Sequence, residues 1–221
     1  KEIAHFINSD LKLIHNEDDV CFGYIPGENA IVHNANLMGA RLLSRLYYLN
    51  GEELFKELAY KSLRYSMKSQ RKDGAWIYGN AKHWKWIDNF HTGFNLVAIK
   101  DIQKYLDINE FNEGINKGLN FHINNHFTDD LLPKYYDNSL YPIDIHNFAQ
   151  GIDTFIEFEQ FEKADKLFKL AIEKMWLSRH RYFYYQINKF YINKVNYIRW
   201  SQSWMLYALS KYILRRTNEG Y

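Results

Sequence analysis

The sequence predicts an all-α protein of the (α/α) toroid type, in which helical hairpins form an incomplete barrel. Two observations lead to this prediction. Helices that are apolar around most of their circumference alternate with helices that carry one apolar stripe, which indicates an enclosed inner layer and an outer surface layer. The junctions before the apolar helices recur, and their anchors lie 54, 58 and 53 residues apart: Gly39, Gly93, Gly151 and Trp204. Such a repeat predicts hairpins that stack side by side. An open α-solenoid is the alternative, and the toroid is favoured because the long aromatic loops all fall at one end.

The composition fits one globular domain and excludes several classes of protein. The chain has 221 residues, of which 47% are apolar, enough for a single domain over residues 1–221 with a large core. With 28 basic and 26 acidic residues the net charge is +2, which is too balanced for a nucleic-acid-binding protein. No run of 18 apolar residues occurs, so we expect no transmembrane segment. The single Cys21 excludes an intrachain disulfide.

The chain begins without methionine inside a helical pattern, so we expect it to be a fragment of a longer protein. We also expect a cytoplasmic location.

The first expected helix covers 1–15 and leads to a loop at 21–32 that contains glycines and a proline. The enclosed and striped helices then alternate. The enclosed helices are expected at 34–49, 88–106, 146–159 and 200–216, and the striped ones at 52–69, 109–126 and 162–178.

The connections alternate in the same way. Turns from an enclosed helix to a striped one are short, whereas the return connections at 70–87, 127–145 and 179–199 are long and aromatic. Within the last of these, two alternating aromatic runs flank Asn188 and Lys189, which predicts a small β-hairpin. The segment DGAWIYG at 73–79 is interpreted as half of another short ribbon.

The starts of the enclosed helices are polar, where an enclosed helix should bury apolar groups. If these ends meet at a central cavity, their free N–H groups and positive dipole ends favour anionic or hydroxyl-rich ligands there. The residues at these starts form the candidate binding set: His33, Asn34, Asn36, Asp88, Asn89, His91, His146, Gln150, Arg199 and Gln202. A structural interpretation stands beside the functional one, because Asn34, Asp88 and Ser201 also lie where N-caps belong.

Asp88 and His91 are the strongest candidates for acid–base chemistry. Three residues apart, they share one face of a helix, and a carboxylate in that place can orient a histidine base. His146 occupies the related position of the next hairpin and completes the candidate catalytic set. A second carboxylate of a glycosidase would have to come from Asp73, Asp137 or Asp144.

The other candidate residues bind substrate, and none is expected to bind a metal. Trp76, Tyr78 and Trp86 are suited to stacking on sugar rings, although the same rings could close the end of a barrel. Arg199 is assigned to a carboxylate or phosphate of the ligand. No compact metal motif is present, so no metal and no cofactor are predicted. His122 and His126 are interpreted as surface or packing residues.

Two motifs resemble a known family. The pattern Q-x-x-D-G-x-W-x-Y-G at 70–79 and the run WIDNFHTG at 86–93, with NAN at 34–36 upstream, resemble a bacterial family of polysaccharide-biosynthesis-associated (α/α) toroid proteins. That family is related in fold to six-hairpin glycosidases, terpenoid cyclases and prenyltransferase β subunits. The resemblance implies the fold and a surface-glycan or exopolysaccharide context, and it implies no particular reaction.

Three hypotheses about function follow. The first is a carbohydrate-active protein that acts on a glycan or glycan precursor by acid–base chemistry, as a hydrolase, lyase or epimerase. The second is a non-catalytic glycan-binding or scaffold protein, which the small number of carboxylates favours. The third, an isoprenoid cyclase, is disfavoured because the chain lacks the acidic DxDD element and its helix starts are polar. The expected partner is an oligosaccharide or polysaccharide, and the sequence makes no prediction about oligomeric state.

Overall fold

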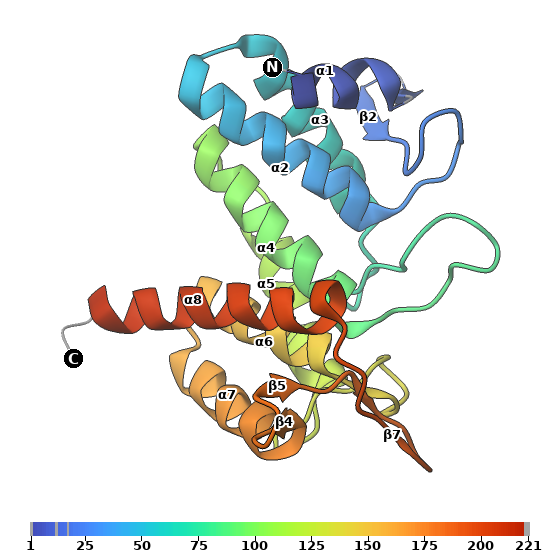
Figure 1. Cartoon of the computed structure of the whole chain (residues 1–221). Helices are drawn as coiled ribbons and strands as arrows, with labels where there is room; N and C mark the ends of the chain where they lie inside the picture. Colours follow the sequence, from blue (N-terminus) through green and yellow to red (C-terminus); the bar gives the residue numbers. More distant parts are fainter. Residues whose placement is uncertain (1, 12, 17, 219–221) are drawn as a thin grey trace. The chain divides into compact units, whose positions relative to one another are not determined.

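The computed structural model describes residues 2–11, 13–16 and 18–218 (Figure 1). By contacts the chain divides into two compact units, Lys1–Ile87 with Phe94–Phe121 and Asp88–Gly93 with His122–Tyr221. A single domain over the whole chain therefore stays a prediction. Seven long helices are found in the described part of the chain: α2 (His33–Asn50), α3 (Glu53–Lys68), α4 (Asn89–Leu106), α5 (Asn112–His126), α6 (Ile145–Glu157), α7 (Phe161–Met175) and α8 (Ser203–Asn218).

The predicted alternation of enclosed and striped helices is confirmed for α2 to α7. In the first unit α2 and α3 pack as a hairpin. The turn between them is short because Gly51 takes the left-handed conformation, with φ at 72°, and donates its N–H to the Tyr47 carbonyl. The buried face of α3 is the predicted stripe, which includes Phe55, Leu58 and Leu63. The boundaries of α2 and α3 lie within one residue of those expected.

The predicted helix over 1–15 is wrong in its second half. The chain forms α1 (Glu2–His5) and a π-helical turn η1 (Phe6–Asp10), and then an antiparallel pair, β1 (Leu13–Asn16) with β2 (Asp19–Phe22). The loop expected at 21–32 accordingly begins inside β2. Contacts from distant residues explain the difference, because α2 and α3 both bind β2. Such tertiary contacts override a local helical pattern.

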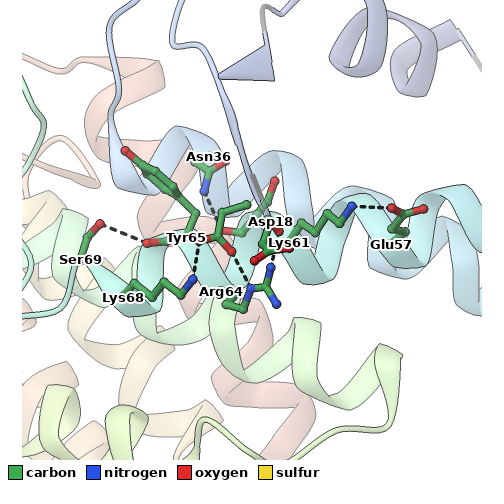
Figure 2. Close-up of polar contacts among 10 residues, drawn as sticks. Asp18, Asn36, Glu57, Lys61, Arg64, Tyr65, Lys68 and Ser69 are labelled. Atoms are coloured by element: carbon green, nitrogen blue, oxygen red, sulfur yellow. Dashed lines mark hydrogen bonds and ion pairs between the residues drawn. The ribbon is translucent and has the colours of Figure 1, made fainter. Parts of the chain in front are cut away.

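Asp19 and Asn36 make these contacts, and Figure 2 shows Asn36 with Arg64 and Lys68, the two partners of Asp19. The Asp19 carboxylate accepts hydrogen bonds from Arg64 at 2.5 Å and from Lys68 at 2.6 Å. Burial raises the pKa of Asp19, but these two hydrogen bonds outweigh it and hold the pKa below its usual range. Asn36 accepts from the Phe22 N–H at 2.9 Å and donates to the Ser62 carbonyl at 2.9 Å. One buried amide thus ties α2, α3 and β2 together.

The second unit is built around α6. Its core contains Phe148, Ile152 and Phe155 of α6, packed with apolar side chains of α7 and α8 such as Leu167 and Met205. Almost every residue of α6 is buried, as expected for an enclosed helix.

The prediction that the last helix is enclosed is wrong, because α8 packs mainly against α6 and leaves Leu206, Ile213 and Leu214 exposed.

Two of the repeat anchors are glycines at close helix contacts in this unit. A Cβ on Gly151 would lie 2.6 Å from Leu167 Cδ2, and one on Gly93 would lie 2.6 Å from Gln150 Cγ. The repeat read from the sequence therefore marks places where neighbouring side chains leave no room for a larger residue.

The predicted β-hairpin is confirmed, with a longer turn. Strand β6 (Gln186–Ile187) pairs antiparallel with β7 (Ile192–Asn193), and the Asn188 N–H donates to the Tyr191 carbonyl across a four-residue turn. Strand β3 (Ile143–Asp144) pairs with β6 and completes a sheet of order β3-β6-β7. A second pair joins β4 (Trp176–Leu177) to β5 (Tyr182–Phe183), so the helix expected over 162–178 ends at Met175 and continues as a strand.

The other expected ribbon, at 73–79, forms no regular strand. Its end is joined to the following segment by two backbone hydrogen bonds, from Tyr78 to Trp86 and from Gly79 to Trp84. The last helix also differs from expectation, because the π-helical turn η2 (Ile198–Gln202) precedes α8. Ser201 is buried inside this turn, so the prediction that it is the N-cap is wrong. No helix of the described residues is long and apolar enough to cross a bilayer.

Replacing Asn36 should destabilise the first unit. Asn36→Ala removes three hydrogen bonds in a fully buried place, to Phe22, Ser62 and Ser66. We expect the free energy of unfolding to fall by about 2–3 kcal/mol, because the partners lose a buried acceptor and donor. Urea denaturation followed by circular dichroism measures the change. The matched control is Asn116→Ala on the exposed face of α5, and an equal effect of both substitutions would contradict the role assigned to Asn36.

Candidate functional site

Asp88 and His91 form a hydrogen-bonded pair at the start of α4. Asp88 Oδ1 accepts from the His91 backbone N–H at 2.9 Å, and Asp88 Oδ2 lies 2.7 Å from His91 Nδ1. The Asp88 side chain is fully buried, whereas 22% of the His91 side chain is exposed. Because a carboxylate oxygen accepts hydrogen bonds, Nδ1 carries the proton in this interaction. Asp88 is thus a helix cap and also orients an imidazole.

His146 lies beside this pair. Its ring stacks on Phe90 with 4.5 Å between ring centres and on Trp204 with 4.9 Å. Burial, with a smaller effect of His91, lowers the pKa of His146 to about 3, although Asp88 acts in the opposite direction. His146 is therefore neutral at physiological pH, and the three residues predicted as catalytic lie together in the second unit.

Asp144 is another buried carboxylate of this unit. It caps α6: Oδ1 accepts from the His146 N–H at 2.8 Å, and Oδ2 accepts from Gln186 Nε2 at 2.6 Å. Burial raises the pKa of Asp144 to about 6, although these two hydrogen bonds oppose the rise. Of the carboxylates that the sequence offered as a second acid, Asp73 is exposed and pairs with Arg71. Asp144, by contrast, is buried.

Tyrosines surround the two carboxylates. Asn89 donates its backbone N–H to the Tyr135 carbonyl, and Ile145 donates to the Tyr185 carbonyl, so the loops before α6 and α8 meet the helix starts. Burial, then Asp144 and then Asp88, raise the pKa of Tyr135. Burial, then Asp144 and then Tyr197, raise the pKa of Tyr185 to about 12. Both phenols therefore stay protonated, and both lie within electrostatic reach of a carboxylate. We call Asp88, His91, Tyr135, Asp144 and His146 the Asp88 cluster.

Several predicted binding residues of the second unit make bracing contacts within the protein. Asn89 donates to the His126 carbonyl at 2.9 Å and to the Lys134 carbonyl at 3.1 Å. Gln150 is buried and hydrogen-bonds Thr154 at 3.3 Å. Gln202 pairs with the Phe183 backbone in both directions. Arg199 is exposed and lies over the Trp200 ring, 5.3 Å from its centre.

Several predicted residues of the first unit also make contacts within the protein. His33 is buried beside Ser66, with 3.3 Å from Nδ1 to Oγ, and Trp76 is buried and donates to the Ser66 carbonyl. Asn34 lies inside α2, whose N-cap is Val32, so the capping prediction for Asn34 is wrong. Asn36 makes the bracing contacts described above.

Tyr78 and Trp86 of the first unit differ from their neighbours in exposure. Their rings are stacked, with centres 4.8 Å apart and an interplanar angle of 11°. Trp86 is 36% exposed and Tyr78 is half-buried, whereas Trp76 is buried. Tyr78 and Trp86 are therefore the more exposed rings of the predicted aromatic set.

Sequence reasoning missed Asp144 as the cap of α6, and it missed Trp204 as an aromatic partner of His146. The available signal for Asp144 was its place just before an apolar helix, where aspartate is a favoured N-cap. His122 and His126, interpreted as surface or packing residues, are both buried and lie 3.0 Å apart between their Nδ1 atoms. They are packing residues.

A cavity in the first unit and the arrangement of possible metal ligands also bear on where the functional site lies. A cavity of about 400 Å³ lies in the first unit, lined by Glu53, Lys56, Glu57, Tyr60, Leu106 and Ile108. It contains none of the candidate catalytic residues. Within the part of the chain that the structure describes, no three histidine, cysteine, aspartate or glutamate side chains gather as a metal site would require.

Solved structures of known proteins share this fold, although no protein-family model and no curated protein matches the sequence. Cellobiose 2-epimerase from Bacillus thermoamylovorans is 11% identical, with a TM-score of 0.78 over 97% of this chain and 64% of its own. An unsaturated glucuronyl hydrolase specific for heparin is 13% identical, with a TM-score of 0.68 over 97% of this chain and 66% of its own. The GH76 alpha-mannanase from Bacteroides thetaiotaomicron is 11% identical, with a TM-score of 0.66 over 81% of this chain and 56% of its own.

These similarities confirm the predicted fold class and the predicted fold-level relationship. The chain has an (α/α) toroid fold of the six-hairpin glycosidase type. It spans 56–66% of the length of the three solved structures.

The pKa of Asp144 predicts a pH dependence of stability. Because the folded-state pKa of about 6 lies above the ordinary value of 3.8, the folded state binds the proton more tightly than the unfolded state. The resulting stabilisation is complete below about pH 4 and is lost as pH rises through 6, which amounts to about 3 kcal/mol. Asp144→Asn should remove this loss. Urea denaturation at pH 4 and pH 7 should therefore show the variant gaining about 3 kcal/mol relative to the parent protein at the higher pH.

Asp130→Asn, an exposed carboxylate in the loop after α5, is the control for this measurement. If Asp144→Asn and the parent protein show the same pH dependence, Asp144 does not retain its proton in the folded state.

Proposed function

We propose that this protein is a carbohydrate-active enzyme that transforms a saccharide by acid–base chemistry. The observation that carries the proposal is the Asp88–His91 pair, in which a buried carboxylate accepts a hydrogen bond from Nδ1 of a partly exposed imidazole and so orients its ring. This is the arrangement that a general base requires. The structures that share the fold include a sugar epimerase and enzymes that hydrolyse glycosidic bonds, which supports the choice of substrate class.

The proposed chemistry divides among three residues. His91 takes a proton from the substrate at Nε2, and the Asp88 carboxylate stabilises the imidazolium that forms. His146 is neutral, so its ring offers one donor and one acceptor without adding charge. Asp144 has a pKa of about 6 and is therefore the residue best suited to return a proton as a general acid near neutral pH.

Aromatic faces would hold the sugar ring. Trp204 lies against His146, and Trp200 is 45% exposed beside Tyr185. In the first unit, the stacked pair of Tyr78 and Trp86 is proposed as a second aromatic surface for saccharide binding. Flat apolar rings with polar edges match the apolar faces and hydroxyl rims of pyranose rings. Arg199 is exposed, so it is proposed to contact a carboxylate or phosphate at the solvent-facing edge of the bound saccharide.

Asp88→Asn tests catalysis separately from capping. Asparagine is as good an N-cap as aspartate, so the unfolding midpoint should change little, whereas the loss of the charge should lower turnover by at least about 100-fold. The protein is incubated with cellobiose, an α-linked mannobiose or a heparin-derived unsaturated disaccharide, and the anomeric proton signals are followed by NMR. Asp73→Asn, an exposed carboxylate of the loop before α4, is the matched control and should retain full turnover.

The outcome also separates the proposed enzyme from a non-catalytic glycan-binding protein. If a sugar binds but is not turned over at every pH tested between 5 and 8, the result favours the binding protein and contradicts the proposal. Equal turnover by Asp88→Asn and the parent protein would show that Asp88 serves only as a helix cap.

A further inference from the structure

Four aromatic side chains gather on two loops of the first unit, one between β2 and α2 and the other between α3 and α4 (Figure 1). The Trp84 ring packs edge-on against Tyr78, with 5.7 Å between ring centres, and edge-on against Tyr24, with 6.1 Å. Tyr78 in turn stacks on Trp86. The four rings therefore form one continuous aromatic cluster.

Backbone hydrogen bonds fix the loop that carries three of these rings. The Tyr78 N–H donates to the Trp86 carbonyl at 2.8 Å, and the Gly79 N–H donates to the Trp84 carbonyl at 3.2 Å. A Cβ on Gly79 would lie 2.9 Å from Trp84 Cε3, so the glycine leaves room for the indole to lie against the backbone. The two stacked rings thus stand on paired stretches of backbone.

The two loops are also bound to each other. The Asn80 N–H donates to the Ile31 carbonyl at 3.0 Å, and the Asn80 side-chain oxygen accepts from the Ile31 N–H at 3.0 Å. Aromatic rings that are held in place before a ligand arrives bind it at a smaller entropic cost than mobile ones. This arrangement therefore suits a binding surface.

Parts of the cluster are open to solvent. Tyr24 is 43% exposed and Trp86 is 36% exposed, whereas Tyr78 and Trp84 are half-buried. Single exposed apolar residues are common on protein surfaces, but a group of them in mutual contact indicates a place where a ligand binds. Rings with a phenol or indole edge match the apolar faces and hydroxyl rims of pyranose rings.

Basic side chains accompany the aromatic rings. The loop 78–86 contains Lys82 and Lys85, and both side chains are exposed. In the sequence of this loop and of the loop 24–32, Glu28 is the only acidic residue. The charge carried by the two loops is therefore positive on balance at neutral pH.

The charge of Lys85 acts close to the aromatic cluster. Burial, and then Lys85, lower the pKa of His33 to about 4. The His33 backbone N–H donates to the Tyr78 carbonyl at 3.3 Å, so His33 directly adjoins the cluster. A carboxylate of a ligand stacked on these rings would lie within reach of the same positive charge.

We infer that the aromatic cluster and its two lysines bind acidic oligosaccharides, in which uronate residues carry the charge. We call this set the Trp84 surface: Tyr24, Tyr78, Lys82, Trp84, Lys85 and Trp86. The inference rests on the proposed function and specifies the ligand class of the aromatic surface in the first unit. The rings stack on the sugars, and the ammonium groups bind the carboxylates through charge-assisted hydrogen bonds.

Aromatic rings combined with lysines also bind single-stranded nucleic acids in other proteins. The net charge of +2 on this chain is too balanced for that function. The inference therefore commits to a saccharide, and an oligonucleotide enters the test as the competing ligand.

Matched oligosaccharides test the inference. The tetramer of β-1,4-linked mannuronate is compared with β-1,4-mannotetraose, and tetragalacturonate is compared with its methyl ester. The members of a pair share linkages and ring stereochemistry and differ in the charge at C6. Isothermal titration calorimetry at pH 7 and 50 mM salt should show the acidic member binding at least about fivefold more tightly. The preference should shrink at 500 mM salt, because salt screens exposed charges.

Substitutions separate the effect of charge from that of stacking. Lys82→Gln combined with Lys85→Gln should bring the affinity for the acidic member close to that for the neutral one, which should stay unchanged. Trp86→Ala should weaken both members by a similar factor of about ten, because both lose a stacking surface. Lys72→Gln combined with Lys117→Gln is the matched control, since these two lysines are exposed and lie outside the two loops. This control should keep the preference for the acidic member.

Three results would overturn the inference. The first is that the neutral member of each pair binds as tightly as the acidic one, or that neither member binds. The second is a preference for the acidic member that survives when Lys82 and Lys85 are both replaced. The third is an eight-nucleotide oligothymidine that binds as tightly as the acidic sugars.

Turnover is measured separately, so the failure of the inference and that of the proposed function can be told apart. Saccharide turnover that depends on Asp88, without a preference for acidic members, leaves the proposed function standing while the inference fails. Preferred binding of acidic members without any turnover supports the Trp84 surface and contradicts the proposed enzyme activity.

Discussion

A carboxylate at the first turn of an enclosed helix is the interaction on which the candidate site depends. An enclosed helix buries its N-terminal N–H groups away from bulk water, and these groups must find acceptors within the protein. Asp88 meets this requirement for α4 and Asp144 for α6. Both carboxylates are almost completely buried, and so the capping requirement alone places two ionisable groups inside the second unit.

Capping and chemistry are compatible at Asp88 because a carboxylate has two oxygens. Oδ1 accepts the backbone N–H of His91, and Oδ2 accepts the ring Nδ1–H of the same residue. The first interaction fixes the carboxylate, and the second fixes the imidazole tautomer and its orientation. The two interpretations that the sequence left open for this pair therefore describe one arrangement.

The equivalent junction of the first hairpin shows that a repeat does not carry function with it. His33 and Asn36 stand at the related positions of α2, but their polar atoms bind Ser62, Ser66 and the backbone of Phe22. The N-cap there is Val32, which has no side-chain acceptor. The first hairpin uses its polar junction to hold β2 against α2 and α3, which leaves no buried carboxylate at that helix start.

The patterns of burial were readable from the sequence, and the partners of individual side chains were not. Hydrophobic periodicity predicted α2 to α7 with boundaries that differ by no more than a few residues, and the spacing of Gly93 and Gly151 marked close helix contacts. The prediction failed over 11–22, where Arg64 and Lys68 hold Asp19 and the chain pairs as β1 and β2. It failed also at Asn34 and Ser201, which lie within helical turns and cap nothing.

By itself, the sequence determined the alternation of helices and the place of Asp88 and His91 three residues apart, because both depend on local periodicity alone. Tertiary structure decided which polar residues remain available. Asn89, Gln150 and Gln202 are consumed by contacts with loops or neighbouring helices. Asp144 gained its raised pKa from burial, which no local pattern encodes. The physical reason is that burial and hydrogen-bond partners are supplied by residues far away in the chain.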